Sequence, residues 1–286
     1  MGKWNKGKWL FTVSALVLGL AACGQGAAEK EEGGATSASG EGTQTVVVGV
    51  APGPYGEMVT DVLGPLMEEK GFTLTTKTFN DYVQPNKALA DEQIDANLFQ
   101  HTAYLEKFSA DNGLDLTALG HVPTLGMGIY SKELKSLSEL PEGAKVSIAN
   151  DASNLARTLQ LLEANELVTI ADDIDETKAT VNDIAENPKN FDFKELDAAQ
   201  LARSIDNVDI ALVPGNFSWA ADLDPADALA LEKLQEQYKN VVAVRTQEKD
   251  SALGQAFTEV LTSDAFKEAI AASPFKDFDQ PASWNK

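Results

Sequence analysis

Two side chains near the middle of the sequence have the types and the spacing to bind a small acidic molecule. Asn154 and Arg157 lie about one helical turn apart in ASNLAR (152–157), so they share a face if this segment is a helix. A guanidinium donates two parallel hydrogen bonds to one carboxylate, which makes Arg157 the candidate partner for an acidic group. From the residues alone, a solvated helix-surface position for Arg157 and an N-cap role for Asn154 remain open.

The inventory of catalytic and metal-binding side chains is thin. His101 and His121 are the only histidines, Cys23 is the only cysteine, and neither a glycine-rich phosphate loop nor a G-x-S-x-G motif occurs. A metal site usually needs three or more His, Cys or carboxylate ligands. We therefore expect no catalytic residue, no metal and no cofactor. Hydrolytic chemistry by a pair of acidic side chains stays open, because no spacing singles out one pair among the 44 acidic residues.

The N-terminus has the features of an export signal. Three lysines precede an apolar run, 10–22, which is shorter than the roughly 20 residues of a transmembrane helix. LAAC (20–23) resembles the bacterial lipobox, where cleavage precedes the cysteine and lipid is attached to its sulfur. We expect residues 1–22 to be a lipoprotein signal peptide and Cys23 the lipidated anchor; an ordinary signal peptide followed by a free cysteine is the alternative.

The segment after the cysteine predicts a flexible connection to the membrane. Residues 24–44 lack aromatic and large aliphatic side chains, so we expect 23–44 to be the lipidated cysteine and a disordered tether, spanning on the order of 25 Å. Without the three lysines of the signal peptide, the net charge is 20 − 44 = −24. This charge argues against nucleic acid as a partner. Such a lipid anchor would place the chain at the extracytoplasmic face of the cell membrane.

Two α/β units follow the tether. The first has strand patterns at 45–50, 72–79 and 94–99, a turn at 51–57, a helix from Met58 that ends at Gly71, and a turn and helix at 83–93. The second has a strand, a helix and two further strands at 146–150, 152–165, 208–215 and 240–246, and the chain closes with helices over 251–272, one of them capped by Ser263. This order predicts parallel sheets in two lobes, with ligands bound at strand carboxyl ends and helix N-termini.

The block DYVQPNKALADEQIDANLFQHTAYL (81–105) resembles the MetQ/NlpA family of methionine-binding lipoproteins of ABC importers. That family shows a near-identical Asp-Tyr-x-x-Pro-Asn…Asp-x-Asn-x-Phe-Gln-His pattern. Segments 48–58, 126–157 and 238–246 agree with it in order, so the resemblance covers about 45–286.

The resemblance implies an α/β, two-lobed periplasmic-binding-protein fold, type II-like, with the ligand cleft between the lobes. Lobe 1 would comprise 45–125 and 246–286, and lobe 2 would comprise 126–245. It also implies a protein that is not an enzyme but binds an amino acid and delivers it to a membrane permease coupled to a cytoplasmic ATPase.

The resemblance further implies a set of ligand-binding residues: Tyr82, Phe99, His101, Asn154, Arg157, Asn216 and Asn240. The aromatic and imidazole members would surround a thioether, which gains roughly 0.3–1.5 kcal/mol from each sulfur–aromatic contact. Arg157 and Asn154 would hold the carboxylate, and the amide of Asn240 would meet the polar end of the ligand. Apart from the resemblance, core positions for the aromatic residues and a turn at the start of a strand for Asn240 remain open.

One segment departs from the family pattern. VPGNFSW (213–219) stands where family members commonly carry Ile-Asn-x-Asn-Tyr-Ala, so Pro214 takes the place of a ligand-contacting Asn. Proline has neither a polar side chain nor a backbone N–H, and Asn216 is the candidate replacement. ANDASN (149–154) likewise replaces a common Pro-Asn-Asp-Pro-Thr-Asn. These changes leave the identity and the stereochemistry of the ligand open.

The favoured interpretation is a lipid-anchored binding protein that delivers L-methionine or a close relative to an ABC permease and its ATPase. D-methionine, a methionine dipeptide or another apolar amino acid are alternative ligands. A surface lipoprotein or adhesin that has kept the fold without its small ligand is the second hypothesis, and a tethered enzyme or metal-capturing protein is the third.

Overall fold

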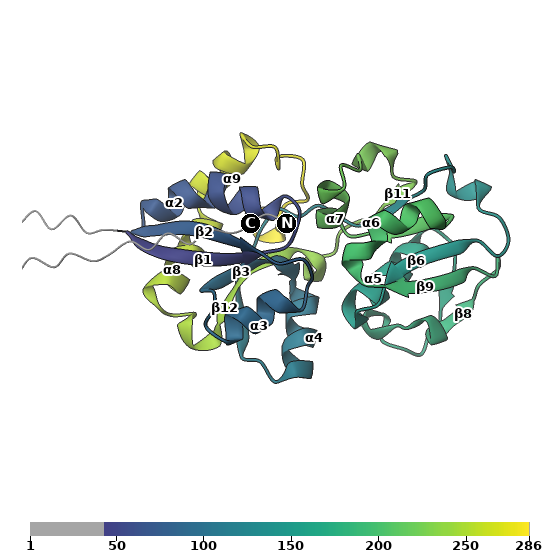
Figure 1. Ribbon diagram of the computed structural model, residues 1–286, viewed down its shortest axis with the longest axis horizontal. Helices are drawn as coiled ribbons and strands as arrows, with labels where there is room; N and C mark the ends of the chain where they lie inside the picture. The colour runs from purple at the N-terminus through teal and green to yellow at the C-terminus, as the bar shows by residue number, and fades with distance from the viewer. Residues whose placement is uncertain (1–42, 286) are drawn as a thin grey trace, which may run out of the picture. The chain divides into compact units, whose positions relative to one another are not determined.

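The computed structural model describes residues 43–285 (Figure 1). The predicted signal peptide, Cys23 and all but the end of the predicted tether lie outside the described residues. Within 43–285, no helix is long and apolar enough to cross a membrane.

The first lobe is built on a five-stranded sheet with the order β2-β1-β3-β12-β4. The strands are β1 (Gln44–Val50), β2 (Phe72–Thr78), β3 (Ala96–His101), β4 (Leu116–His121) and β12 (Asn240–Arg245). β1 pairs in parallel with β2 and β3, as predicted, whereas β12 runs antiparallel to β3 and β4. The pattern at 94–99 placed β3 two residues early. The backbone N–H of Asp95 donates to the carbonyl of Val47 at 2.9 Å, but the N–H of Val47 donates to the carboxylate of Asp95 at 2.7 Å rather than to a backbone carbonyl.

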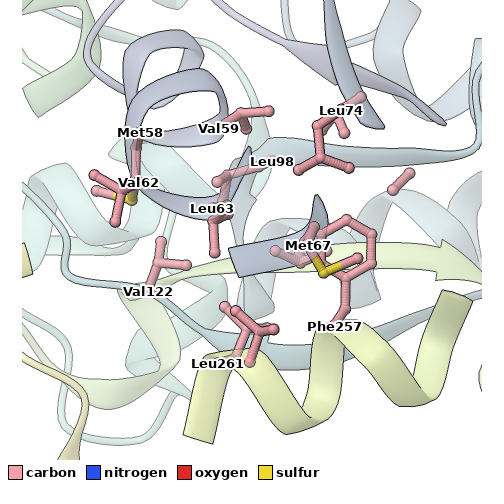
Figure 2. Close-up of a cluster of buried hydrophobic side chains, with 14 of the residues drawn as sticks. Met58, Val59, Val62, Leu63, Met67, Leu74, Leu98, Val122, Phe257 and Leu261 are labelled. Carbon is pink, nitrogen blue, oxygen red and sulfur yellow. The ribbon is translucent and has the colours of Figure 1, made fainter. Parts of the chain in front are cut away.

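Alternating side chains of β1 direct the packing of this sheet. Val46 and Val48 face one core, which is covered by helices from the N-terminal and C-terminal parts of the described chain. Val47 faces the other core, which is covered by α3 (Gln84–Ala90) and α4 (Thr102–Asn112). The helices of the first face are α1 (Tyr55–Glu57), the π-helical η1 (Met58–Leu63), α2 (Gly64–Glu68), α8 (Ala252–Thr262) and α9 (Asp264–Ala271). Figure 2 shows Met67 close to Phe257 of α8, and Met58, Leu63 and Leu261 belong to the same core.

Two helix boundaries bear on the predictions. The first helix begins at Tyr55, inside the segment predicted as a turn, and its central portion is π-helical. Ser263 caps α9 as predicted, because its hydroxyl accepts from the backbone N–H of Phe266.

The second lobe holds a five-stranded sheet with the order β11-β5-β10-β6-β9. Its strands are β5 (Gly128–Tyr130), β6 (Lys145–Ala149), β9 (Asp192–Leu196), β10 (Ile210–Val213) and β11 (Ala230–Leu231), and a separate pair joins β7 (Thr169–Ile170) to β8 (Ile184–Glu186). α5 (Ala152–Ala164) covers one face, and α6 (Leu201–Ser204) and α7 (Gly215–Ala220) cover the other. β10 stops short of the predicted 215 because α7 begins directly after Pro214.

Short 3₁₀ turns complete the chain and occur mainly in connections. They are η2 (Leu137–Glu139), η3 (Glu176–Lys178), η4 (Val181–Asp183), η5 (Ala198–Gln200), η6 (Ile205–Asn207), η7 (Pro225–Asp227), η8 (Glu236–Tyr238), η9 (Thr246–Glu248) and η10 (Ala282–Asn285).

Two segments connect the sheets: the first crossing segment (122–127) and the second crossing segment (232–239). The predicted boundary at 245/246 assigned β12 to lobe 2, but β12 hydrogen-bonds to β3 and β4 in the first sheet. Its hydrophobic pattern marks a buried strand without indicating which sheet it joins, because both sheets offer apolar partners. We therefore propose that lobe 2 ends before Asn240, and we keep its predicted start at 126.

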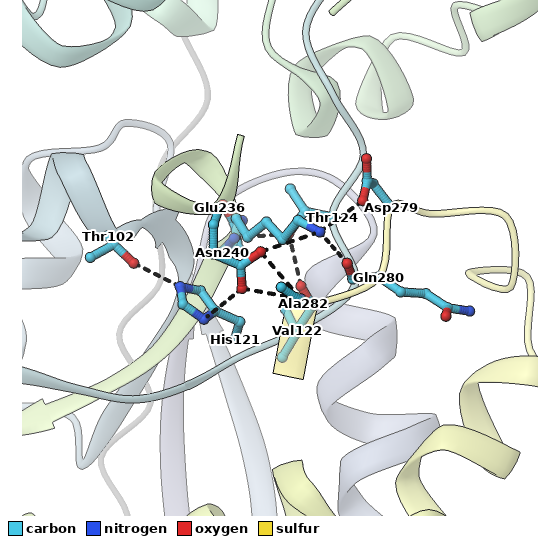
Figure 3. Close-up of polar contacts among 10 residues, drawn as sticks. Thr102, His121, Val122, Thr124, Glu236, Asn240, Asp279, Gln280 and Ala282 are labelled. Carbon is cyan, nitrogen blue, oxygen red and sulfur yellow. Dashed lines mark hydrogen bonds and ion pairs between the residues drawn. The ribbon is translucent and has the colours of Figure 1, made fainter. Parts of the chain in front are cut away.

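The crossing segments are tied to the C-terminal part of the chain (Figure 3). Thr124 exchanges two backbone hydrogen bonds of 3.0 Å with Asp279, and the hydroxyl of Thr124 accepts from the backbone of Asn240 at 2.8 Å. Lys239, 5% exposed, places its ammonium 2.7 Å from a carboxylate oxygen of Asp279. These contacts fix where each crossing segment leaves the first lobe.

Candidate functional site

One cavity is lined by residues of both lobes, and all seven residues predicted to bind ligand line it. The other lining residues are Tyr55, Gln100, Tyr104, Thr124, Leu125, Pro214 and Gly215. The cavity has a volume of about 20 Å³. This is room for about one water, so the two walls of the cavity lie close together.

Side chains from opposite lobes hydrogen-bond across this cavity. The hydroxyl of Tyr82 donates to Oδ1 of Asn216 at 2.5 Å, and Nδ2 of Asn216 donates to the backbone oxygen of Pro52 at 3.0 Å. Nε2 of His101 lies 3.1 Å from Oδ1 of Asn154. Because each bond joins one lobe to the other, the structure describes a closed arrangement.

Aromatic rings form the apolar wall of the cavity. The ring centroid of Tyr82 lies 5.8 Å from Phe99, 5.7 Å from Tyr104 and 5.1 Å from Phe217, distances typical of favourable aromatic pairs. Tyr104 lines the cavity and was not among the predicted binding residues, whereas Phe217 packs against Tyr82 without lining the cavity. The sequence could have indicated Tyr104, because it follows His101 by three residues and would lie on the same face of a helix that begins there.

The protonation of His101 follows from its contacts. His101 is the N-cap of α4, and its Nδ1 accepts from the backbone N–H of Tyr104 at 3.1 Å. The proton of the neutral ring is therefore on Nε2, which donates to Asn154. Burial, with a smaller contribution from the nearby charge of Arg157, lowers the pKa of His101 to about 3. Above that pH the cavity presents a neutral imidazole donor.

Arg157 is buried rather than solvated, with 5% of its side chain exposed. Its Nε donates to Oε2 of Glu232 at 2.9 Å, and its Nη2 donates to Oε1 of the same carboxylate. The guanidinium carbon lies 5.1 Å from the ring centroid of Tyr238, a cation–π distance. The helix-surface alternative for Arg157 is therefore wrong.

Asn154 does not cap its helix. The N-cap of α5 is Asp151, whose carboxylate accepts from the backbone N–H of Asn154 and from its Nδ2, both at 3.0 Å. This fixes the amide so that Oδ1 faces His101, and Nη1 of Arg157 also approaches that oxygen at 3.4 Å. Burial raises the pKa of Asp151.

Asn240 and Pro214 contribute different surfaces. Asn240 is 6% exposed and starts β12, and within residues 43–285 its side-chain amide has no hydrogen-bond partner. Pro214 precedes α7 and lines the cavity with its ring. Asn216, the expected replacement for the missing family Asn, is committed to Tyr82 and Pro52.

Other polar residues of the 81–105 block have a structural role. Asn86, Asn97 and Gln100 are buried and form a closed amide network with hydrogen bonds of 2.7–3.0 Å. The network ties α3 to β3 and thereby positions Phe99 and His101. Its satisfied amides stabilise a core that unpaired amides would destabilise.

Arg157 is the only charged residue among those lining the cavity in the described part of the chain. No group of three or more His, Cys, Asp or Glu side chains within 43–285 is arranged to hold a metal ion. A cavity with one guanidinium, several amides and hydroxyls, and an aromatic wall is suited to binding a small molecule that carries one carboxylate and an apolar side chain.

Two α/β lobes joined by two crossing segments, with a cavity lined from both, define a substrate-binding protein of the periplasmic type. The family model described as NlpA lipoprotein matches residues 46–283, and the chain belongs to this family. The family consists of binding lipoproteins, so the prediction that the chain is not an enzyme is confirmed.

Individual relatives are similar over most of their length. The D-methionine-binding lipoprotein MetQ of Escherichia coli K12 is 37% identical over 268 residues, which are 92% of this chain and 94% of that protein. A nutrient-binding protein of Burkholderia cenocepacia, solved bound to methionine, is 40% identical with a TM-score of 0.76, over 81% of this chain and 97% of that one. A periplasmic substrate-binding protein of an ABC transporter from Coxiella burnetii is 38% identical with a TM-score of 0.73, over 79% and 96%.

Proposed function

We propose that this protein is the lipid-anchored, extracytoplasmic binding protein of an ABC importer and that its ligand is L-methionine or a close relative. The observation that carries the proposal is the division of one cavity between an aromatic wall and a buried guanidinium. Tyr82, Phe99 and Tyr104 supply the wall from one lobe, and Arg157 faces them from the other. A thioether gains from sulfur–aromatic contacts on one side while its carboxylate meets the guanidinium on the other.

The amide of Asn240 supports an amino-acid ligand. The amide lines the cavity without a hydrogen-bond partner among the described residues, so it can offer both a donor and an acceptor to a ligand. In this proposal the ammonium of the ligand meets neutral oxygen atoms, because the cavity wall carries no carboxylate among its described residues.

The partners follow from the same proposal. The Coxiella burnetii relative is named as a component of an ABC transporter, which supports a permease and its ATPase as the recipient of the ligand. Lipid attachment at Cys23 would keep the protein at the extracytoplasmic face of the cell membrane. The Escherichia coli relative is named for D-methionine, so both stereoisomers belong in the test.

Calorimetric titration tests the proposal. The mature chain from residue 23, carrying Cys23→Ser, is unfolded and refolded to remove carried ligand and is then titrated with L-methionine, D-methionine, glycyl-methionine and leucine. We expect saturable binding of methionine, and Arg157→Ala should weaken it roughly 30- to several-thousand-fold, since losing one partner of a buried charged pair costs about 2–5 kcal/mol. Arg203→Ala, on the exposed side of α6, is the matched control and should bind like the wild type.

Two results would contradict the proposal in different ways. No heat with any of the four ligands would favour a surface lipoprotein that has kept the fold without its small ligand. An unchanged dissociation constant in Arg157→Ala would leave methionine binding in place and reject the assigned carboxylate site.

A further inference from the structure

The carboxylate of Glu232 reaches Arg157 from the second crossing segment. Its side chain is 7% exposed, and its backbone N–H donates to the carbonyl of Met127 at 3.0 Å, while the N–H of Met127 donates back to the Glu232 carboxylate. A Cβ on Gly126 would lie 3.1 Å from Cγ of Glu232, so glycine leaves room for this side chain. Glu232 is therefore held in place by the first crossing segment independently of Arg157.

Glu232 occupies one of the two edges of Arg157 that fit a carboxylate. The Nε–Nη2 edge is taken by Oε2 and Oε1 of Glu232, and the ring of Tyr238 covers a face of the guanidinium. The remaining edge is formed by Nη1 and the second hydrogen of Nη2, and its Nη1 approaches Asn154 in the cavity. A ligand carboxylate meets this edge while Glu232 keeps the other.

The pair has a consequence for the charge of the site. Arg157 and Glu232 are both nearly buried and together carry no net charge. The next ionisable group, Asp151, lies behind Asn154, and its carboxyl can add only negative charge, which also disfavours an anion. A ligand that is only an anion would therefore add an uncompensated charge to a buried site, which is costly, whereas a zwitterion would add none.

We propose that Glu232 sets the charge selectivity of the site: by cancelling the charge of Arg157 and occupying one of its edges, it makes the cavity select a zwitterion over an anion of the same shape. The inference rests on the proposed function and assigns Glu232 as a positioning and specificity-determining residue. Glu232 has this effect without touching the ligand.

A charge series of three ligands tests it. L-methionine is a zwitterion, 4-(methylthio)butanoate is the anion that lacks the ammonium, and methionine methyl ester is the cation that lacks the carboxylate. We expect the wild-type mature chain to bind the anion at least about 100-fold more weakly than methionine. In Glu232→Gln, the ratio of the dissociation constant of the anion to that of methionine should fall at least tenfold, which is about 1.4 kcal/mol. The methyl ester should lose affinity relative to methionine in this variant.

Two variants separate charge from structure. Glu232→Asp keeps the charge and should keep the wild-type ratio even if all three ligands bind more weakly. Glu236→Gln removes the same charge four residues further along the second crossing segment, where the side chain contacts His121 and the backbone of Ala282 and lies outside the cavity. Its ratio should stay within twofold of the wild type.

The outcomes are distinct. A wild-type ratio that persists in Glu232→Gln, with methionine still bound, overturns the inference and leaves the proposed function standing. If Glu232→Gln does not fold, the wild type decides: an anion bound less than about 100-fold more weakly than methionine overturns the inference, and weaker anion binding supports it. If the wild type binds none of the three ligands, the proposed function fails and the inference fails with it.

Discussion

Nε2 of His101 and Oδ1 of Asn154 lie 3.1 Å apart and join the two lobes across the cavity. His101 comes from the end of β3, and Asn154 comes from the first turn of α5. Each is fixed from behind, His101 by the backbone of Tyr104 and Asn154 by the carboxylate of Asp151. Donor and acceptor are therefore set in orientation before the lobes meet, which lowers the entropy lost on closure.

Acid should destabilise the fold through His101. Its folded pKa of about 3 lies below the ordinary 6.5, so between these values the unfolded chain binds a proton that the folded chain does not. The free energy of unfolding should therefore rise with pH across this window, by up to about 1.4 kcal/mol per pH unit, and be independent of His101 above about pH 6.5. Urea denaturation from pH 4 to 8 measures the slope.

Two variants isolate this effect from the carboxylates that titrate nearby. His101→Gln should flatten the pH dependence relative to the wild type, whereas His121→Gln, at a half-buried histidine on β4, should retain most of it. Equal slopes in wild type and His101→Gln would show that folding does not lower the pKa of His101.

The hydrogen bond between Tyr82 and Asn216 should stabilise the closed form of the ligand complex. Tyr82→Phe removes the hydroxyl but keeps the ring, and we expect methionine to bind about 3- to 10-fold more weakly, since a hydrogen bond contributes about 0.5–1.5 kcal/mol. A double-mutant cycle with Asn216→Ala measures the coupling by calorimetry. Strictly additive effects would mean that the two side chains do not interact in the complex.

Gly53 allows the lobes to approach. It has φ +133°, and a Cβ there would lie 2.6 Å from the backbone oxygen of Asn216 in the opposite lobe. Gly53→Ala should therefore weaken methionine binding at least about tenfold, because the lobes cannot close fully. Gly71→Ala is the matched control, with φ +88° but no atom within 4 Å of the added Cβ. It should lower the thermal stability while leaving binding unchanged, and an equal loss of binding in both variants would contradict the steric explanation.

Lys239 should stabilise the junction between the second crossing segment and the C-terminal part of the chain. Lys239→Met removes its contacts with Asp279 and with the backbone oxygen of Gln280 and should lower the free energy of unfolding by about 1–3 kcal/mol. Lys233→Met, at an exposed lysine of the same segment, is the control. A urea midpoint that shifts equally in both variants would argue against a specific role for Lys239.

Much of the fold could be predicted from local patterns. β1, α5 and the helix pair α8–α9 appear near their predicted positions, because each carries a strong strand or helix periodicity and a clear end signal such as the cap at Ser263. β5 has only three residues, and no periodicity distinguishes so short a strand. The π-helical turn at Met58–Leu63 likewise keeps the side-chain pattern of an ordinary amphipathic helix.

Seven residues of the cavity wall were predicted through the resemblance of short blocks of sequence, and the structure brings all seven of them to one cavity, whereas Tyr104 was missed. The sequence did not indicate which side chains these residues contact. Glu232 is 75 residues from Arg157, and only the path of the second crossing segment brings the two together. The sequence alone therefore determined which side chains are available for binding, since residue types and spacings are local. The tertiary structure alone decided that β12 joins the first sheet and that the guanidinium already has a counter-ion, because strand pairing and charge balance depend on contacts between distant segments.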